Sequence, residues 1–354
     1  MNRIPDQLTI RAPASLLLAG EYAILEEGGL GIGVAVECVA TLTRVPGEPR
    51  ITGVFGRESA TGGRPTAGVL ERASASAADS AGPLESMARS LFGSALPTSI
   101  GDVTIDTSSF FDANGKKRGY GSSGAVAVLL ASLRHRLDVN GVPDTQTDGD
   151  PGATGNELDP GAIFHDAVEA HRAAQRGRGS GYDVACSVFG GLLLFSGGAR
   201  PTVRRLDLSW MPPLWLLQGR SPVSSADAVS RYRSWQSGNT TQAGRFLEQS
   251  NLLVSEICVA TSWRDARPLI EEYRELAVQL GGAIGVPADA PVAGTAAPAT
   301  RDGMPAARIA SGKTDGLAKC VGAGDELVVW FGADGKHLAG SERVHVAGKG
   351  VAWE

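Results

Sequence analysis

A glycine-rich stretch directly before an apolar segment is the feature that most restricts the fold of this chain. Residues 118–125 read RGYGSSGA, and residues 126–133 read VAVLLASL. Glycine lets the backbone approach an anion closely because no Cβ stands in the way. A helix that begins there adds unpaired N–H groups and the positive end of its dipole. The stretch predicts either a phosphate-binding loop or a structural turn followed by a helix N-cap; the lysine of a GxxxxGK[ST] loop is absent.

Two further glycine stretches occur later in the chain. Residues 176–183 read RGRGSGYD, so that Asp183 stands directly before an apolar helical segment. Its carboxylate would either stabilise the helix N-terminus or accept a proton and orient a hydroxyl group. Arg172, Arg176 and Arg178 add positive charge nearby, either for an anionic ligand or as a solvated basic turn. Residues 319–326 read KCVGAGDE and lead into a strand, which a hairpin turn explains equally well.

The spacing of hydrophobic residues predicts a mixture of helices and strands around these stretches. We expect strands over residues 8–13, 15–19, 30–43, 100–108, 192–195 and 326–331. We expect helices over residues 83–92, 124–135, 162–176, 183–189, 224–233, 241–259 and 263–280. Residues 45–82 are expected to form hairpins or loops, and residues 138–160 and 286–305 are expected to be loops.

The length of 354 residues favours two domains over one. Composition changes near residue 200: tryptophans stand at positions 210, 215, 235 and 263, and the first 200 residues contain none. We therefore expect an N-terminal domain over residues 1–200 and a C-terminal domain over residues 201–354.

Charge and cysteine content argue against several classes of protein. A net charge of −5 gives neither the basic footprint of a nucleic-acid binder nor attraction to an anionic membrane. The longest apolar runs are too short to span a bilayer. Four cysteines are scattered singly, which favours free thiols in a reducing compartment over a zinc site. We expect a soluble, cytoplasmic protein without nucleic-acid or membrane partners, and the oligomeric state is left open.

Three stretches of the chain, in this order, resemble the motifs of the GHMP small-molecule kinases. Residues 11–26 read RAPASLLLAGEYAILE and resemble that family's first motif, APGKxxLxGEY. Residues 118–125 are similar to its second motif, GLGSSAA, and the GAG of residues 322–324 is similar to its third, GAGGG. The phrases AGEYAILE and AHRAAQRGRGSGYDVACSVFGG (residues 170–191) look most like the phosphomevalonate kinases within the family.

This resemblance implies an α+β protein with the two-domain GHMP kinase fold, namely a ribosomal-protein-S5-like N-terminal domain and a ferredoxin-like C-terminal domain. It implies transfer of the γ-phosphoryl group of ATP, with Mg2+, to a small-molecule acceptor such as phosphomevalonate. Asp183 falls at the position of the family's catalytic aspartate.

The resemblance also assigns roles to the residues of the motifs. Those that would wrap the ATP phosphates are Gly119, Gly121, Ser122, Ser123, Gly124 and Ala125, with Ser122 or Ser123 helping to hold Mg2+. Those expected near substrate or nucleotide are Ser15, Glu21, Tyr22, Lys117, His171, Gln175, Ser180, Gly181, Gly322 and Gly324.

The chain departs from the family pattern at several of these positions. Ser15 replaces the first-motif lysine, Tyr120 replaces a leucine and Gly124 replaces an alanine. The third stretch brings Asp325 and Glu326 close to a loop that is expected to border phosphates, where their charge would repel ATP.

These departures leave three hypotheses open. In the first, the chain is an active kinase in which Lys117, Arg178 or Lys319 replaces the lost lysine. In the second, the acceptor differs and is mevalonate or a sugar. In the third, the chain binds a ligand or a partner without turnover.

Overall fold

The computed structural model describes residues 7–55, 66–71, 82–112, 115–139, 159–219, 224–289, 316–338 and 340–353. Most of the loops expected over residues 138–160 and 286–305 lie outside the described residues. The chain packs into two compact units. Unit 1 comprises Met1–Ser15, Cys38–Gly190 and Ala347–Glu354, and unit 2 comprises Leu16–Glu37 and Gly191–Val346. The expected division into residues 1–200 and 201–354 stays a prediction about which segments form the family's two domains.

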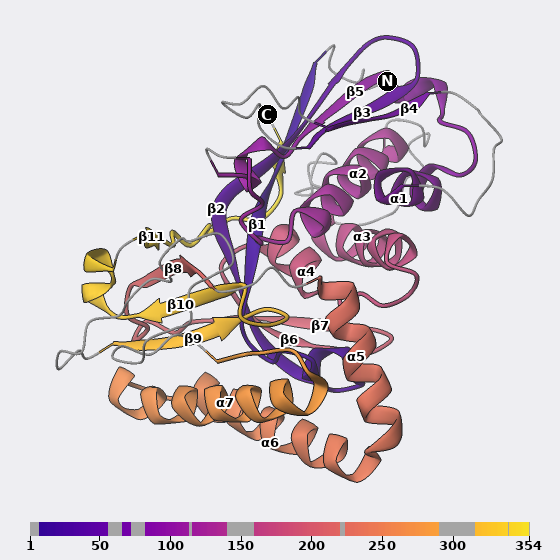
Figure 1. Cartoon of the computed structure of the whole chain (residues 1–354). Coiled ribbons are helices and arrows are strands. Elements are labelled where there is room, and N and C mark those ends of the chain that lie inside the picture. The colour runs from indigo at the N-terminus through magenta and orange to yellow at the C-terminus, as the bar shows by residue number, and fades with distance from the viewer. Residues whose placement is uncertain are drawn as a thin grey trace, which may run out of the picture. The chain divides into compact units, whose positions relative to one another are not determined.

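Two long strands, β1 (Leu8–Ala19) and β2 (Leu30–Val45), contribute residues to both units. In unit 1 they lie in a sheet whose strand order is β12-β1-β2-β5-β3-β4 (Figure 1). The other strands of this sheet are β3 (Arg50–Phe55), β4 (Thr66–Glu71), β5 (Asp102–Asp106) and β12 (Ala352–Trp353). Strands β3 and β4 pair antiparallel, so the region expected to hold hairpins or loops contains a two-stranded antiparallel ribbon.

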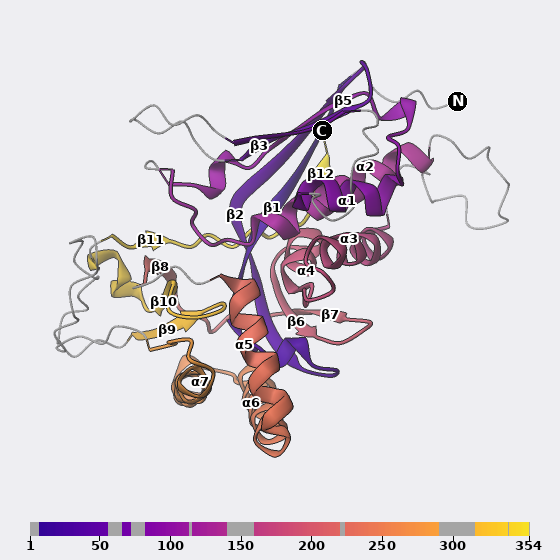
Figure 2. The same cartoon turned by 45° about the vertical axis from the view of Figure 1, so that its right-hand side comes forward.

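Four helices lie together on one side of the unit 1 strands in both views (Figures 1 and 2). They are α1 (Pro83–Phe92), α2 (Ser122–Val139), α3 (Pro160–Ala174) and α4 (Tyr182–Phe189). Helix α2 packs against the other three, and every side chain from Ala125 to Leu133 is buried. The apolar run after the first glycine stretch thus forms the central helix of the layer.

Unit 2 contains the other end of β2, which pairs antiparallel with β6, and β6 pairs with β7. A separate four-stranded sheet has the order β11-β8-β10-β9. The strands are β6 (Leu192–Ser196), β7 (Thr202–Leu206), β8 (Leu214–Gln218), β9 (Leu317–Val321), β10 (Leu327–Phe331) and β11 (Glu342–Arg343). Three helices complete the unit: α5 (Ser225–Gly238), α6 (Thr240–Val259) and α7 (Trp263–Ile284). Helix α7 packs against α6 and β9.

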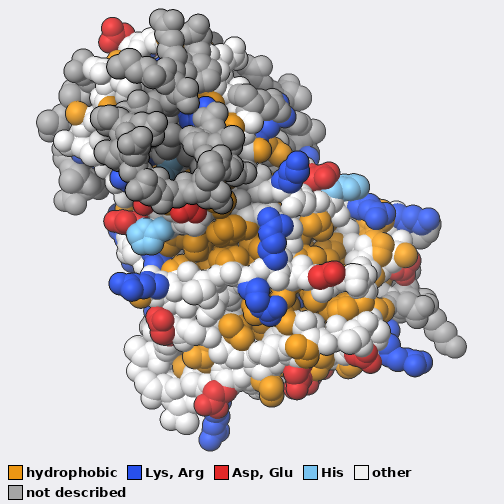
Figure 3. Space-filling model, turned by 180° about the vertical axis from the view of Figure 1, so that it is seen from behind, with side chains coloured by type: hydrophobic (Ala, Val, Ile, Leu, Met, Phe, Trp, Pro, Cys, Tyr) orange, Lys and Arg blue, Asp and Glu red, His pale blue; other side chains and the backbone are white. Residues whose placement is uncertain are grey.

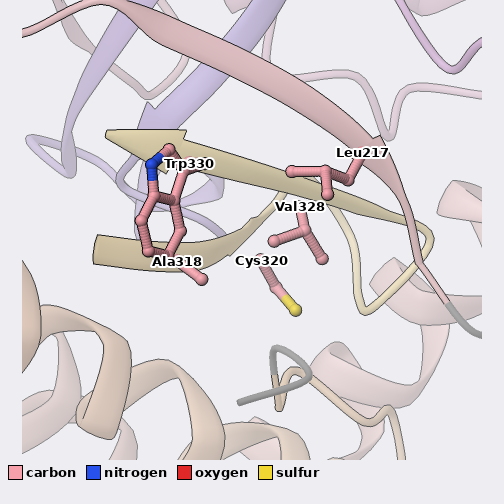
Figure 4. Close-up of a cluster of buried hydrophobic side chains, with 5 residues drawn as sticks. All are labelled: Leu217, Ala318, Cys320, Val328 and Trp330. Atoms are coloured by element: carbon pink, nitrogen blue, oxygen red, sulfur yellow. The ribbon is translucent and has the colours of Figure 1, made fainter. Parts of the chain in front are cut away.

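One face of the four-stranded sheet carries a cluster of buried apolar side chains (Figure 4). Its members are Leu217, Ala318, Cys320, Val328 and Trp330. Because successive residues of a strand face opposite sides of the sheet, Lys319 lies on the other face from Ala318 and Cys320. Lys319 is therefore a charged residue that lies among buried side chains.

The predicted break at Pro13 was wrong: β1 runs without interruption from Leu8 to Ala19. Strand β12 pairs with Ile10 and Arg11 and does not reach Pro13. Proline is accepted in a strand where the ladder needs no N–H donor, and the carbonyl of Pro13 accepts a hydrogen bond from Ser187 Oγ at 2.7 Å. The predicted helices are present, and their ends differ from the expected ones by a few residues.

Within the described residues, no helix is both long enough and apolar enough to cross a bilayer. On the face seen in Figure 3, positive and negative side chains are interspersed among hydrophobic ones (Figure 3).

Candidate active site

The first glycine stretch forms a tight loop at the start of α2. Gly119 and Gly121 have φ values of 79° and 69°, a left-handed conformation that glycine adopts without steric cost. Tyr120, between them, is buried, and its carbonyl accepts a hydrogen bond from the Ser15 N–H at 3.0 Å. The loop is therefore fixed to β1 and leads directly into an 18-residue helix that begins at Ser122. The N-terminus of such a helix favours negative charge.

Asp183 lies in the first turn of α4, next to this loop. It is buried, and its Oδ1 accepts a hydrogen bond from the Val184 N–H at 3.0 Å. A Cβ atom on Gly124 would lie 2.7 Å from Asp183 Cγ. The carboxyl group of Asp183 can therefore lie at the start of α2 because residue 124 has no side chain.

Helix α3 adds His171 to the same place, and the residue that caps its C-terminus, Gln175, lies there too. His171 is 2% exposed, and its Nε2 lies 3.1 Å from Ser123 Oγ and 3.5 Å from Asp183 Oδ2. The side-chain amide of Gln175 lies 2.8 Å from the same nitrogen. Residues from α2, α3 and α4 thus converge on one imidazole nitrogen.

Arg172 shapes the second glycine stretch. Its guanidinium donates to the carbonyl of Gly179 at 3.0 Å and to that of Ser180 at 3.3 Å. Gly181, with φ 92°, is the N-cap residue of α4. Arg178 and Lys117, two of the cations considered as replacements for the missing lysine, are exposed. Arg172 therefore holds the loop before Asp183 by hydrogen bonds to the backbone carbonyls of that loop.

Ser15 is buried near Asp183. Its Oγ has no hydrogen-bond partner among the described residues. A Cβ on Gly121 would lie 2.7 Å from Ser15 Oγ and 3.4 Å from Asp183 Cβ, so the two side chains flank the same glycine. The position that carries lysine in the GHMP motif is thus occupied by a small buried hydroxyl group.

In unit 2, Glu21 and Lys319 form a buried ion pair. Lys319 Nζ lies 2.5 Å from Glu21 Oε1, and the two residues are 1% and 6% exposed. The ammonium group also donates to the carbonyl of Cys320 and lies 5.1 Å from the ring centroid of Tyr273. Burial raises the pKa of Glu21, and the charge of Lys319 offsets part of that effect. Lys319 is the third cation considered as a replacement for the first-motif lysine, and its ammonium group is held in the ion pair with Glu21.

Tyr22 contacts the third glycine stretch within unit 2. It has an unusual positive φ of 64°, and its hydroxyl group donates to the carbonyl of Ala323 at 2.7 Å. Burial is the main cause that raises its pKa. Ala323 stands between Gly322 and Gly324, so Tyr22 anchors that loop. Asp325 is buried, so its side chain does not project from the loop into solvent.

The residues present fit an Mg2+ ion that arrives with nucleotide phosphates. The described residues contain no cluster of three or more His, Cys, Asp or Glu side chains that would hold a metal by themselves. Mg2+ is commonly bound through one or two protein oxygens together with substrate phosphates and water. Ser123 Oγ and Asp183 Oδ2, which both lie near His171 Nε2, offer such oxygens.

This fold is that of solved phosphomevalonate kinase and mevalonate kinase structures, and the expected α+β fold class is confirmed. The Lin0012 protein from Listeria innocua matches with a TM-score of 0.68 and 17% identity over 98% of this chain and 99% of that one. Streptococcus pneumoniae phosphomevalonate kinase, in complex with phosphomevalonate and AMPPNP, matches with a TM-score of 0.61 and 17% identity over 95% and 99%.

A mevalonate kinase also matches, with a TM-score of 0.59 and 13% identity over 96% of this chain and 99% of that one. No family model matches the sequence, and no curated protein matches it. At these identities the likeness establishes the fold.

Proposed function

We propose that the chain is an ATP-dependent small-molecule kinase. The observation that carries this proposal is the buried carboxyl group of Asp183, which lies against Gly124 at the start of the helix that follows the glycine loop. An anion-binding helix N-terminus beside a carboxylate is the pairing that phosphoryl transfer to a hydroxyl group or a phosphate needs. The GHMP-kinase fold supports the same reaction class.

Each part of the site then has a chemical task. Gly119, Gly121, Ser122, Ser123, Gly124 and Ala125 would hold the nucleotide phosphates. Ser123 would help to hold an Mg2+ ion, which would neutralise phosphate charge on a bound ATP, the donor of the phosphoryl group. Asp183 would orient the acceptor oxygen and accept its proton where the acceptor is a hydroxyl group. Positioning and charge neutralisation supply most of the rate in this chemistry, so a site with few catalytic groups is sufficient.

Phosphomevalonate is the acceptor that we propose, with mevalonate or a sugar as the alternative. Support comes from the phrases AGEYAILE and GSGYDVA and from the likeness to a phosphomevalonate kinase structure. The residues proposed to lie near acceptor or nucleotide are Ser15, Glu21, Tyr22, Lys117, His171, Gln175, Ser180, Gly181, Gly322 and Gly324.

The loss of the first-motif lysine has to be compensated in an active enzyme. Lys319 is buried in its ion pair with Glu21, whereas Lys117 and Arg178 are exposed. We therefore propose Lys117 or Arg178 as the compensating cation. If the chain were a non-catalytic ligand-binding relative, there would be no turnover for either cation to support.

A coupled assay of ADP release tests the proposal. The full-length protein is incubated with Mg-ATP and phosphomevalonate, mevalonate or a panel of sugars, with Asp183→Ala as the control. We expect turnover with one acceptor and a loss of about 100-fold or more in the control. Near-normal turnover in Asp183→Ala would exclude the assigned role, and absence of both turnover and nucleotide binding in the wild type would favour the non-catalytic alternative.

The role of Ser123 gives a second test. Replacing Ser123 by alanine removes the hydroxyl group proposed as an Mg2+ ligand while keeping the helix intact. We expect the Mg2+ concentration needed for half-maximal rate to increase. An unchanged Mg2+ dependence would count against a metal role for this hydroxyl group.

The contact between Ser123 and His171 also favours a second candidate, a serine hydrolase. In a hydrolytic triad, however, the acid lies on the imidazole nitrogen that does not face the serine. Here Asp183 and Ser123 both face Nε2, and Nδ1 has no hydrogen-bond partner among the described residues. We expect no labelling of Ser123 by a fluorophosphonate probe; labelling that is lost in Ser123→Ala would revive this candidate.

A further inference from the structure

We propose that Tyr22 is a positioning residue whose strained backbone turn, clamped by Arg233 of α5 and Asn251 of α6, holds the loop of residues 322–324 through the Tyr22 hydroxyl group. All of these residues belong to unit 2. The proposal deepens the kinase assignment, and its importance for ligand binding rests on that proposed function. The arrangement of the turn itself can be measured without turnover.

Tyr22 is the central residue of a γ-turn. Its backbone has φ 64° and ψ −39°, and the Ala23 N–H donates to the carbonyl of Glu21 at 2.8 Å, across this single residue. The γ-turn with a positive φ is rare and strained, because the side chain of an L-residue crowds the backbone there. Such a conformation persists only where neighbouring contacts hold it.

Side chains from two helices hold the backbone on either side of this turn. Before it, the Gly20 N–H donates to the hydroxyl oxygen of Tyr273 of α7 at 2.7 Å. After it, the guanidinium of Arg233 of α5 donates to the carbonyl of Leu25 at 2.8 Å and pairs with the carboxylate of Glu26. The backbone that enters the turn and the backbone that leaves it are therefore both fixed.

Asn251 of α6 holds the end of the same segment with both ends of its side-chain amide. Its Nδ2 donates to the carbonyl of Gly28 at 3.1 Å, and its Oδ1 accepts the Leu30 N–H at 2.8 Å. A carboxylate at this position could accept from Leu30 but could not donate to Gly28, so the amide is matched to this stretch of backbone. Neither contact involves Tyr22 itself.

The side chain of Tyr22 joins the clamped segment to the glycine loop. Its hydroxyl group donates to the carbonyl of Ala323 at 2.7 Å, and its ring packs against that of Tyr232 of α5, with centroids 5.2 Å apart. Burial raises the pKa of Tyr22, so the hydroxyl group keeps its proton and stays a donor. Ala323 stands between two glycines, where the backbone is free to take many conformations unless something holds it.

The clamps and the side-chain contacts act on Tyr22 from two directions. If its φ relaxed to a negative value while the backbone on either side stayed fixed, its Cβ would point elsewhere and the hydroxyl group would leave Ala323. The strain of the turn is thus offset by the hydrogen bond and the ring contact that it makes possible. In this way Tyr22 transmits the position of the clamped segment to the loop.

Two variants of Tyr22 test whether the turn is strained. Tyr22→Ala and Tyr22→Gly both remove the side-chain contacts, but only glycine adopts this backbone conformation without strain. At an unstrained position glycine is the less stable of the two, because it gives the unfolded chain more freedom. We expect the reverse here, with a higher urea midpoint for Tyr22→Gly. An equal or higher midpoint for Tyr22→Ala would show that there is no strain to offset.

Hydrogen exchange with mass spectrometry on the full-length protein measures the hold on the loop. Tyr22→Phe keeps the ring and removes the donor, and we expect the amides of residues 322–324 to exchange about 3- to 10-fold faster, the usual effect of one lost hydrogen bond. Asn251→Ala should speed exchange at the same amides, although its own contacts lie at Gly28 and Leu30. Unchanged exchange at the loop in either variant would overturn the proposal.

Helix α5 offers a matched control. Arg231, like Arg233, donates to a backbone carbonyl of another segment, that of Gly285 at 3.0 Å. Arg233→Ala is expected to speed exchange at residues 322–324, and Arg231→Ala is expected to leave it unchanged. If both variants loosened the loop equally, the effect would come from a general weakening of unit 2 and not from the turn.

Kinetics test the consequence in an enzyme shown to be active. We expect Tyr22→Phe and Asn251→Ala each to raise KM for ATP or the acceptor by about 3- to 10-fold. The double variant should be no worse than the more affected single one, because both changes act on the same loop. Additive effects would show that the two residues act independently. Since exchange and stability need no turnover, the proposal can fail while the kinase assignment holds, and the reverse.

Discussion

At the scale of single residues, Gly124 decides where the carboxyl group of Asp183 can lie. A Cβ on Gly124 would come within 3 Å of three atoms of Asp183, including its Cβ. Because the Asp183 side chain is short, it cannot avoid such a group without a shift of the backbone. The glycine that departs from the family motif is thus explained by its contact with the proposed catalytic residue.

Gly124→Ala is therefore expected to displace Asp183 and to lower turnover by about 100-fold, the usual effect of a misplacement of roughly 1 Å at a reacting centre. The ADP-release assay measures it. Gly244→Ala is the matched control, since Gly244 is also helical and a Cβ there would meet nothing within 4 Å. If Gly124→Ala were as active as Gly244→Ala, the assigned contact would not matter for turnover.

Ser15 offers a prediction about stability. Its hydroxyl group is buried without a partner among the described residues, and such a group costs free energy. Ser15→Ala removes the cost, so we expect the free energy of unfolding in urea to be unchanged or to rise by up to about 1 kcal/mol. A clear loss of stability would indicate that the hydroxyl group makes a hydrogen bond in solution.

Sequence motifs predicted a set of candidate site residues, and the structure added how some of them meet. The structure brings the glycine loop, His171, Gln175 and Asp183 close together, and their roles stay predictions. The side-chain neighbours of Ser15 were not predictable, because they come from Gly121 and Asp183, more than 100 residues away. The same holds for Lys319, whose partner Glu21 lies 298 positions earlier in the chain.

At the scale of elements, helices were easier to predict than strands. Long amphipathic segments such as α6 and α7 carry a periodic pattern of their own. Strands β11 and β12 have two residues each, and strand β7 is mostly exposed, so none carries a pattern that single-sequence reasoning detects. Their existence depends on the strands beside them.

The ion pair that links the end of β1 to β9 gives a prediction at this scale. Glu21→Gln leaves the ammonium group of Lys319 buried without a negative partner. We expect the free energy of unfolding to fall by about 3–5 kcal/mol, as is usual when one member of a buried pair is removed. Urea denaturation measures the change.

The double variant Glu21→Gln/Lys319→Met tests the cause. It removes the unpaired charge while keeping a long side chain on the same face of the sheet, so most of the lost stability should return. If the double variant were no more stable than Glu21→Gln, the loss would have to come from packing around Glu21.

At the scale of the whole molecule, thiols that are buried or half-buried make stability depend on alkaline pH. Burial raises the pKa of Cys258 to about 11 and that of Cys320 to about 12, from an ordinary value of 9.0. Because the folded chain keeps these protons to higher pH than the unfolded chain does, it binds more protons above about pH 9. The contribution is complete below pH 9 and is lost as the pH rises towards 11 and 12.

We therefore expect the urea midpoint to fall between pH 8 and pH 10. The variant Cys258→Ala/Cys320→Ala should show a smaller fall over the same interval, since the remaining buried Cys186, whose pKa is raised mainly by burial, still contributes. An equal fall in both proteins would assign the effect to other groups, such as the buried tyrosines.

Unit 1 is built from segments that lie far apart in the sequence, and this constrains when it can fold during synthesis. Residues 347–354 belong to that unit although Gly191–Val346 of unit 2 precede them. There, β12 pairs with β1, and the Val351 N–H donates to the carbonyl of Val188 at 3.3 Å. A ribosome must therefore translate the whole second segment of unit 2 before unit 1 can close. The two units then reach their final folds at nearly the same moment of synthesis, and a nascent chain halted at residue 200 would still carry an unfinished sheet.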